Sequence, residues 1–563
     1  MALGGDKAMG THFIGIDVGT GSARAGVFDA QGALLGTGKA DIAMHRPGGD
    51  IAEQSSAQVW DAVCAATRTA LGRAGIDPGR VTGIGFDATC SLVVAGDGPL
   101  GLGDADHPER DIIVWMDHRA VDQAARINAG GHDVLKYVGG RISPEMQTPK
   151  LLWLKEHRPE IFGAARHFFD LTDFLTWKAS GSTARSTCTV TCKWTYLAHE
   201  GRWDAAYFHG IGLGELAEEG FVRIGTQVVP PGTPLGRGLT PDAARAMGLP
   251  AGIAVAAGLI DAHAGGIGTV AARGGPQNPV STLGYVFGTS SCTMTTTLDP
   301  AFVPGVWGPY FSAMVPGAWL NEGGQSAAGA AIDHLLTLHP AHDAATALAG
   351  ADGKSLPEWL ADAALAQAGD ASQAVRLAAH LHVVPEFLGN RAPFADPHAR
   401  AAILGLGMDS DVQSLVALYV AGVCGLGHGL RQIVETQAAH GAGVDRIAIS
   451  GGAGRHPLIR QILADATGLP VDVTACDEPV LLGSAILAAV AAGAFPDIGT
   501  AMPAMSSVAA THHPATGPVR HLHDARHAAF TTLQDVARSI RAQTQACLNR
   551  FSPDQAATGP SHS

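Results

Sequence analysis

The feature that most constrains the fold is a glycine-rich turn between two short apolar segments, which occurs twice. Residues 13–17 (Phe-Ile-Gly-Ile-Asp) run into Val-Gly-Thr-Gly-Ser at 18–22, and a second apolar segment covers residues 25–28. About 270 positions later, residues 283–287 run into Gly-Thr-Ser-Ser at 288–291 in the same way. A strand, a Gly-Thr-X-Ser turn and a strand, repeated at this spacing, are typical of a duplicated domain. We therefore expect two related α/β domains.

The first turn belongs to a predictable series of elements. Residues 33–37 continue as a third strand, and residues 57–71 carry apolar side chains at helical spacing. Residues 81–86 then form a buried strand that ends at Asp87. The order β-β-β-α-β differs from the strict alternation of a dinucleotide-binding fold. Further along the chain we expect helical segments over 341–374, 412–438, 457–467 and 525–548 and a strand over 446–450.

Composition places the boundary between the domains in the glycine-rich segment 265–279. A chain of 563 residues is long enough for two α/β domains. We expect an N-terminal domain over residues 11–272 and a C-terminal domain over residues 280–505. A C-terminal helix with a disordered tail is expected over residues 511–563.

The composition is that of a soluble enzyme, with 46% hydrophobic and 16% charged residues. A net charge of −14 argues against nucleic acid or an anionic membrane as the main partner. Residues 1–10 lack the basic and apolar regions of a secretory signal, and the apolar run 481–495 is too short to cross a bilayer. We therefore expect a cytoplasmic protein, and whether it forms a homodimer is left open.

The eight cysteines and 25 histidines are dispersed, so no metal site is expected from them. Cys188 and Cys192 lack a second Cys or His pair in the sequence that would frame a site with them. The densest group of histidines is interpreted as part of a solvated tail. Its members are His512, His513, His521, His523 and His527.

The first turn has the chemistry of a phosphate-binding loop. Its glycines let backbone N–H groups approach phosphate oxygens closely, and its hydroxyls add donors. Asp17, just before the turn, suits a hydrated Mg²⁺, and Arg24 beyond it adds a positive charge. A purely structural β-turn is the alternative. The turn residues are Gly19, Thr20, Gly21 and Ser22.

Two later glycine-rich segments extend this hypothesis. Gly288 and Thr289 repeat the chemistry of the first turn, so the two turns could hold a polyphosphate between two domains. A third segment follows a strand and opens a helix, where small residues would let a flat base lie on the backbone. A tight structural turn is the alternative there. The third segment is Gly451, Gly452, Ala453 and Gly454.

Asp261 lies between an apolar strand and a segment rich in glycine and alanine. A carboxylate in such a place is costly to bury unless it has a partner or a task. In phosphoryl transfer, a carboxylate can orient and deprotonate the acceptor hydroxyl. The nearby His263 is interpreted as a core histidine.

Five motifs, in this order along the chain, together resemble the FGGY family of carbohydrate kinases. The resemblance extends from about residue 11 to residue 505, although the literal string Phe-Gly-Gly-Tyr is absent. The motifs are Asp17-X-Gly-Thr-X-Ser-X-Arg24, Lys150-Leu-X-Trp153-Leu, Asp261-Ala-His-Ala, Gly288-Thr-Ser-Ser and Gly451-Gly-X-Gly.

The resemblance implies an actin-like fold of two ribonuclease-H-like domains with an ATP cleft between them. Asp261 would be the general base, and Asp17 and Asp261 would hold Mg²⁺, mostly through water. The two Gly-Thr turns would bind the phosphates of ATP, and residues 451–454 would lie against the adenine. A salt bridge without ligand contact is the alternative for the charged sugar-binding candidates. The positions that match sugar contacts in the family are Thr89, Lys193, Asp261 and Glu322.

Further stretches resemble the pentulose kinases of this family, D-ribulokinases in particular. They imply transfer of the ATP γ-phosphoryl group to the 5-hydroxyl of D-ribulose. L-ribulose, D-xylulose or a pentitol as substrate stays an alternative, because epimers change few contacts. A non-enzymatic sugar- or ATP-binding regulator with the same fold is a further alternative. The stretches are 85–94, 115–119, 192–196, 306–314, 321–326 and 388–397.

Overall fold

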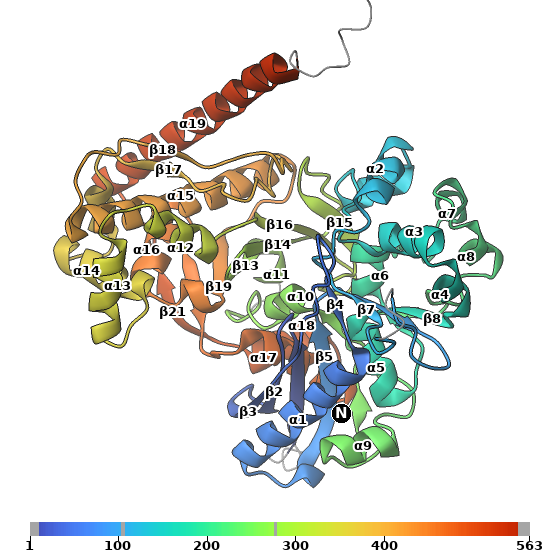
Figure 1. Cartoon of the computed structure of the whole chain (residues 1–563). Coiled ribbons are helices and arrows are strands. Elements are labelled where there is room, and N and C mark those ends of the chain that lie inside the picture. Colours follow the sequence, from blue (N-terminus) through green and yellow to red (C-terminus); the bar gives the residue numbers. More distant parts are fainter. Residues whose placement is uncertain (1–10, 103–106, 275–277, 550–563) are drawn as a thin grey trace, which may run out of the picture.

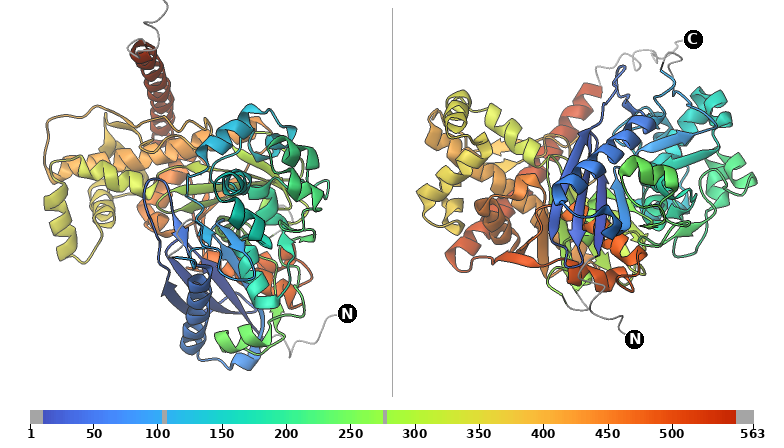
Figure 2. Two further views of the ribbon diagram at one scale, coloured as in Figure 1. Left: turned by 45° about the vertical axis from the view of Figure 1, so that its right-hand side comes forward. Right: turned by 90° about the horizontal axis from the view of Figure 1, so that it is seen from below.

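The computed structural model describes residues 11–102, 107–274 and 278–549. The N-terminal segment 1–10 and the end of the expected disordered tail, 550–563, lie outside the described residues. Two α/β lobes are visible in Figure 1, one formed mainly by the first half of the chain and one mainly by the second. Figure 2 shows the same two lobes from two other directions.

The first lobe is built on a sheet with the strand order β3-β2-β1-β5-β11, and β12 also pairs with β5. The first three strands are antiparallel, and β1 and β5 are parallel. This arrangement confirms the predicted β-β-β-α-β order. The strands are β1 (His12–Val18), β2 (Ser22–Asp29), β3 (Leu34–Asp41), β5 (Val81–Ala88), β11 (Ala254–Val255) and β12 (Leu259–Ile260).

The second lobe repeats this arrangement in the sheet β15-β16-β14-β13-β19-β20-β21. Here β13 and β14 form the antiparallel hairpin, and β19 joins β13 in parallel, as β5 joins β1 in the first lobe. With β16 in the place of β3, the strands β16-β14-β13-β19-β20 match β3-β2-β1-β5-β11, and β15 and β21 are added at the two edges. This match confirms the expected duplication. The strands are β13 (Thr282–Phe287), β14 (Ser291–Thr297), β15 (Trp307–Phe311), β16 (Trp319–Gln325), β19 (Arg446–Ser450), β20 (Val471–Thr474) and β21 (Val508–His512).

Glycines bring two helices close to opposite faces of the first sheet. A Cβ atom on Gly15 of β1 would lie 1.9 Å from the Leu481 carbonyl oxygen of α17 (Pro479–Ala491). On the other face, a Cβ atom on Gly38 of β3 would lie 2.0 Å from the Ala66 carbonyl oxygen of α1 (Ser56–Ala74). The backbones can approach this closely only because these strand positions lack a side chain.

Helix α17 lies between β20 and β21 of the second sheet in the chain but packs on the first sheet. With α18 (Ile498–Met505) it belongs to the same buried cluster as residues of the N-terminal lobe. The two lobes therefore share a core. The domain limits 11–272 and 280–505 stay a prediction.

Helix α1 is longer at both ends than the predicted 57–71. It begins after Ser55, whose hydroxyl accepts a hydrogen bond from the Gln58 N–H, and it ends at Gly75, which is left-handed with φ 64°. The predicted helices over 412–438 and 457–467 are confirmed as α15 (Val412–Ala439) and α16 (Pro457–Thr467).

Helix α15 is long and apolar enough to cross a membrane by length and composition, but 72% of its most apolar window is buried inside the protein. It is therefore a core helix of the second lobe.

The C-terminal helix corrects two expectations. It covers Pro518–Leu548 (α19) instead of 525–548, because Pro518 opens it early. His523 is fully buried with its ring 5.6 Å from that of His428 on α15, so the interpretation of the tail histidines as solvated is wrong for His523. Val519, His523, Arg526 and Phe530 form a stripe at helical spacing, and this stripe docks the first half of α19 on the second lobe.

The remaining strands and helices lie outside the two central sheets. A small sheet contains β4 (Glu53–Gln54), β6 (Leu92–Ala95), β7 (Ile112–Ile113) and β8 (His167–Asp170), and two strand pairs are β9 (Arg185–Ser186) with β10 (Val228–Val229) and β17 (His382–Val384) with β18 (Ala402–Leu404). The helices are α2 (Val121–Ala129), α3 (Gln147–His157), α4 (Pro159–Ala164), α5 (Leu171–Ser180), α6 (Thr187–Trp194), α7 (Ala205–Gly210), α8 (Gly214–Glu218), α9 (Pro241–Met247), α10 (Asp261–Ile267), α11 (Asn278–Ser281), α12 (Gly329–Thr337), α13 (His342–Ala351) and α14 (Leu356–Ala368).

Candidate functional site

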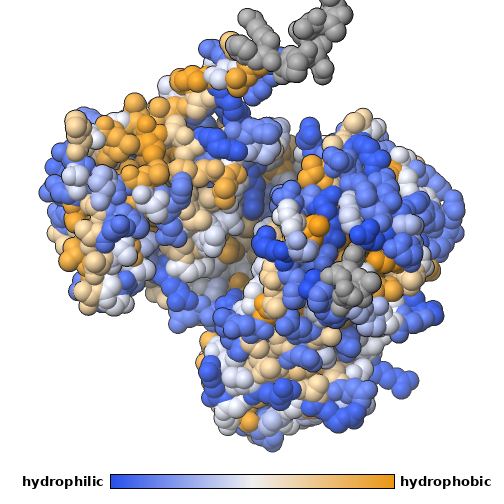
Figure 3. Space-filling model, viewed as in Figure 1, coloured by the Kyte–Doolittle hydropathy of each residue, from blue (hydrophilic) through white to orange (hydrophobic). Residues whose placement is uncertain are grey.

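A cavity of about 390 Å³ lies between the lobes, with walls from both sheets. In the view of Figure 3 the surface is hollowed between the two lobes. The structure brings most of the predicted site residues together in this cavity. Those that line it are Asp17, Gly19, Thr20, Ser22, Arg24, Thr89, Lys193, Asp261, Gly288, Thr289 and Glu322.

The first Gly-Thr turn is the tip of the hairpin formed by β1 and β2. The Gly19 N–H donates to the Ser22 carbonyl at 3.0 Å and closes the turn. The Trp115 indole N–H donates to the Thr20 hydroxyl at 3.0 Å, which fixes the orientation of that hydroxyl. The Thr20 hydroxyl keeps its own proton available for a ligand. Trp115 is thus tied to the turn, besides lining the cavity.

Three carboxylates converge where the central strands end. Asp17 and Asp87 are register partners on the parallel strands β1 and β5, and Asp261 follows β12, which pairs with the end of β5. Asp87 is fully buried, and burial and the Asp17 carboxylate raise its pKa well above its usual range. The Ser484 hydroxyl of α17 donates to Asp87 Oδ2 at 2.6 Å. Asp87 Oδ1 has no hydrogen-bond partner among the described residues.

Asp261 is the first residue of α10, where its carboxylate faces the positive end of the helix dipole. Its Oδ1 accepts a hydrogen bond from the Ala262 N–H at 2.7 Å. Burial and the neighbouring Asp17 carboxylate raise the pKa of Asp261 to about 6. The group is therefore ionised at neutral pH but is a stronger base than an exposed aspartate.

Lys193 and Glu322 supply opposite charges to the cavity from different lobes. Lys193 comes from α6, and its ammonium nitrogen lies 4.6 Å from the centre of the Trp307 ring. Glu322 comes from β16, and its Oε2 lies 3.4 Å from His263 Nε2. Burial opposes the charge of Glu322, but Lys193 and His263 outweigh it and lower the pKa of Glu322 to about 2. Glu322 is thus an ionised acceptor for hydroxyl groups.

The second Gly-Thr turn joins β13 to β14, and its Gly288 N–H donates to the Ser290 carbonyl at 2.9 Å. A second cavity, of about 650 Å³, begins next to this turn and is lined by Phe287, Gly452 and Ala453. Gly451 has φ 96°, and a Cβ atom there would lie 2.4 Å from the Phe287 carbonyl oxygen. The third glycine-rich segment therefore packs directly against the strand that leads into the second turn.

Some predicted site residues do not line the cavities or are already paired with other side chains. Within the described part of the chain, Gly21, Gly451 and Gly454 line neither of these two cavities. The Arg24 guanidinium forms ion pairs with Asp17 and Glu478, with a distance of 2.8 Å to Glu478 Oε2. Arg24 is thus engaged by carboxylates in this structure.

Several cavity residues were missed by reasoning from single motifs. Asp87, which is buried and does not itself line the cavity, was predicted as a strand end and as part of the stretch 85–94, without a role in the site. The carboxylate at the end of a buried strand is the same signal that marked Asp17. Trp307 and Arg391 occur in stretches that carried the family resemblance, without an assigned role; the Arg391 guanidinium lies 5.9 Å from the Trp307 ring centre. Glu145 lines the cavity and no motif pointed to it.

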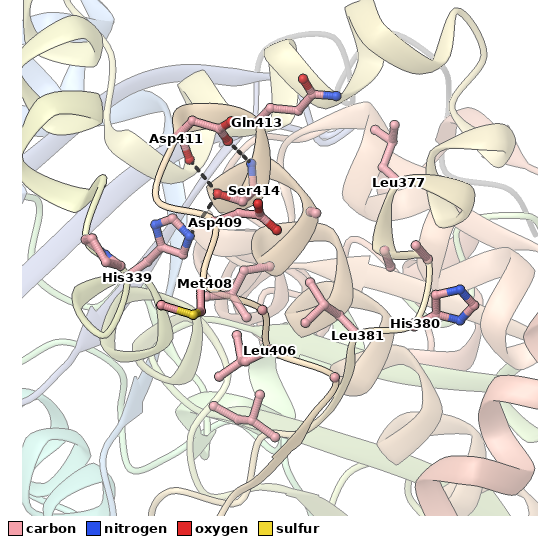
Figure 4. Close-up of a pocket in the computed structure, with 18 of the residues that line it drawn as sticks. His339, Leu377, His380, Leu381, Leu406, Met408, Asp409, Asp411, Gln413 and Ser414 are labelled. Atoms are coloured by element: carbon pink, nitrogen blue, oxygen red, sulfur yellow. Dashed lines mark hydrogen bonds between the residues drawn. The ribbon is translucent and has the colours of Figure 1, made fainter.

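A different cavity, of about 580 Å³, lies on the second lobe. Figure 4 shows that Leu381, Leu406 and Met408 surround it, with His339 and Asp411 at its polar side. None of the predicted site residues in the described chain lines it, so it is separate from the candidate site.

Comparisons with known proteins agree with this geometry. Residues 12–268 match the N-terminal domain of the FGGY family of carbohydrate kinases, and residues 283–492 match its C-terminal domain. The chain is 46% identical over 515 residues to a human FGGY carbohydrate kinase domain-containing protein, covering 90% of this chain and 93% of the human one. It is 38% identical over 517 residues to a D-ribulokinase of Saccharomyces cerevisiae, covering 86% of this chain and 72% of that protein.

Solved structures show the same fold. A xylulose kinase from Rhodospirillum rubrum superposes with a TM-score of 0.75 at 22% identity, covering 94% of this chain and 99% of that one. A glycerol kinase from Plasmodium falciparum, solved with ADP, superposes with a TM-score of 0.72 at 14% identity, covering 94% and 98%. Because both family domains match in order and the relatives are matched over most of their length, this chain belongs to the FGGY family of carbohydrate kinases.

Proposed function

We propose that this carbohydrate kinase transfers the γ-phosphoryl group of MgATP to the 5-hydroxyl of a pentulose, with D-ribulose as the first candidate. The observation that carries the proposal is a single cavity that contains both Gly-Thr turns, the Asp261 carboxylate and the Lys193 and Glu322 charges. The relative named as a D-ribulokinase supports the choice of sugar. Other relatives named as ribulokinase or xylulose kinase keep L-ribulose and D-xylulose as alternatives.

ATP would lie along the line from the second cavity to the first. Its adenine would enter the cavity beside Gly452 and Ala453, and its phosphates would reach past Gly288 to the two turns. Backbone N–H groups and threonine hydroxyls at these turns are suitable donors to phosphate oxygens. The nucleotide would thus bind mainly to the C-terminal lobe and present its terminal phosphate to the N-terminal one.

Asp17 and Asp261 would hold the Mg²⁺ that accompanies ATP, mostly through water. Carboxylate oxygens near one another at strand ends match the hard oxygen donors that Mg²⁺ prefers, and both Asp17 and Asp261 line the cavity. When bound, the ion neutralises charge on the phosphates during transfer. Asp17 also pairs with Arg24, so that ion pair would have to rearrange.

Asp261 would act as the general base, because it is an ionised carboxylate with a raised pKa in the cavity where the sugar would bind. Its carboxylate would accept the proton of the 5-hydroxyl as that oxygen attacks the γ-phosphorus and the bond to the β-γ bridging oxygen breaks. Glu322 would accept hydrogen bonds from sugar hydroxyls, and Lys193 would donate to hydroxyl or carbonyl oxygens. Thr89 would contribute a hydroxyl at the same wall.

The proposal is tested by measuring ADP release with pentuloses, pentitols, hexuloses and glycerol as acceptors. We expect the highest kcat/KM with D-ribulose. A preference for glycerol or a hexulose would reject the pentulose assignment, and the absence of ADP release with every acceptor would reject the kinase activity itself.

A further inference from the structure

Three soft donor atoms meet in the core beside the candidate site. Cys188 Sγ, Cys192 Sγ and a ring nitrogen of His263 all lie within 4.8 Å of one another. The distance from Cys188 Sγ to His263 Nδ1 is 3.1 Å. All three side chains are fully buried. The proposed phosphoryl transfer assigns no role to any of them.

The fold creates this cluster from two helices that are distant in sequence. Cys188 and Cys192 are four residues apart on α6, so both thiols point to the same side of that helix. His263 lies in the first turn of α10, 75 residues after Cys188. Sequence spacing alone gave no second pair to frame the two cysteines, and the packing of α6 against α10 supplies the third donor.

The surroundings of the cluster resemble the support that proteins give to metal ligands. Glu322 Oε2 lies 3.4 Å from His263 Nε2, which leaves His263 Nδ1 directed at the sulfur atoms. A carboxylate that holds the far nitrogen of a histidine is the usual partner of a metal-bound imidazole. The Ile260 N–H also donates to Cys188 Sγ, at 3.4 Å. That bond would stabilise a thiolate.

We propose that Cys188, Cys192 and His263 form a binding site for one Zn²⁺ ion, separate from the Mg²⁺ that accompanies ATP. Two thiolates and an imidazole are the donor set of known zinc sites, and soft sulfur donors disfavour Mg²⁺. Zinc bonds of about 2.3 Å to sulfur and about 2.0 Å to nitrogen would require Cys188 Sγ and His263 Nδ1 to move apart by a few tenths of an ångström.

The cluster adjoins the cavity of the candidate site. Glu322 lines this cavity and also contacts His263 of the cluster. Because α6 carries Lys193 and α10 carries Asp261, a bound ion would link the two helices that present these side chains. The proposal does not depend on which sugar is the substrate.

The test uses the full-length, reduced protein after removal of metals. The protein is incubated with Zn²⁺ and passed over a weak chelating resin that removes zinc bound at surface histidines. The zinc that remains is measured by mass spectrometry. We expect one zinc per chain in the wild type and in the control Cys64→Ser, which alters a buried cysteine of α1 outside the cluster. Cys192→Ser should lose the stoichiometric zinc.

Absence of stoichiometric zinc in the wild type, or its retention in Cys192→Ser, would overturn the proposal. Co²⁺ provides a second measurement that does not depend on the folding of a variant. One equivalent of Co²⁺ added to the wild type should produce the near-ultraviolet charge-transfer absorption of a cobalt–thiolate bond. A Co²⁺ spectrum without that band would also overturn the proposal.

Discussion

Asp261 owes its proposed role to its surroundings more than to its residue type. It lies at the first position of α10, accepts one backbone hydrogen bond and has the Asp17 carboxylate as a neighbour. The helix end stabilises the ionised form, whereas burial and Asp17 destabilise it. The outcome is a carboxylate whose pKa is raised to about 6.

Replacing Asp261 by asparagine keeps the shape of the side chain and removes the base. We expect kcat to fall by about 10²–10⁴, the usual contribution of general base catalysis, while the dissociation constant of the sugar stays within about tenfold. Steady-state kinetics and calorimetric sugar binding measure the two quantities. Near-normal turnover of Asp261→Asn at saturating substrates would show that another group accepts the proton.

The same base predicts the acid limb of the pH profile. Asp261 must be ionised to accept a proton, and its pKa is raised to about 6, so kcat/KM should fall roughly tenfold per pH unit below that value. The residual activity of Asp261→Asn should lack this loss of activity at low pH. The variant therefore distinguishes protonation of Asp261 from protonation of ATP as the cause. A wild-type profile that stays flat down to pH 5 would contradict the assignment.

Among the elements, α17 packs directly on the backbone of the first sheet. It lies on glycines of β1 and β5, where a Cβ atom on Gly83 would be 2.4 Å from the Ala488 carbonyl oxygen. Its Ser484 also holds Asp87 under the site. The position of this helix therefore affects both the core shared by the lobes and the carboxylate cluster.

We expect Gly83→Ala to destabilise the protein by about 1–3 kcal/mol, since the new methyl group meets backbone and forces α17 away from the sheet. The matched control is Gly72→Ala in α1, where a Cβ atom meets nothing within 4 Å and a helix gains about 0.5–1 kcal/mol from alanine. Thermal unfolding midpoints of the two variants should therefore shift in opposite directions. An unchanged midpoint for Gly83→Ala would show that the helix can shift without cost.

The elements differ in how well the sequence predicts them. The hairpins at both Gly-Thr turns, the strand over 446–450 and the helix over 457–467 follow from local periodicity, and the structure confirms their positions. The attachment of α17 to the first sheet does not follow, because it depends on Gly15 and Gly83, which are distant from this helix in the sequence. The docking of His523 on α15 was missed for the same reason: its partner, His428, is distant in sequence.

The candidate site shows the same limit. Asp17 and Asp261 can be proposed from a carboxylate at a strand end, but the convergence of Glu145 and Arg391 on one cavity comes only from the packing of the lobes. The proximity of Cys188, Cys192 and His263 is equally a product of packing. The sequence thus predicted the functional residues at turns and strand ends. It did not predict the side chains that distant elements contribute to the same places.

At the scale of the molecule, the cavity between the lobes predicts closure. Lys193 belongs to one lobe and Glu322 to the other, so a sugar that contacts both would draw the lobes together. Closure would also exclude water, which competes with the sugar as phosphoryl acceptor.

We expect the radius of gyration in X-ray scattering to decrease when sugar and a non-hydrolysable ATP analogue bind together. Asp261→Asn should contract equally at saturating ligand, because closure depends on binding and not on proton transfer. An unchanged radius in the ternary complex of both proteins would contradict closure.

The central claim is that Asp261 faces a triphosphate held by hairpins from both lobes. A crystal structure with D-ribulose and a non-hydrolysable ATP analogue tests it directly. We predict the γ-phosphate between residues 19–22 and 288–290, and an Asp261 carboxylate oxygen within about 3.2 Å of the sugar 5-hydroxyl. A terminal phosphate bound away from either hairpin, or an Asp261 side chain directed away from the sugar, would contradict the claim.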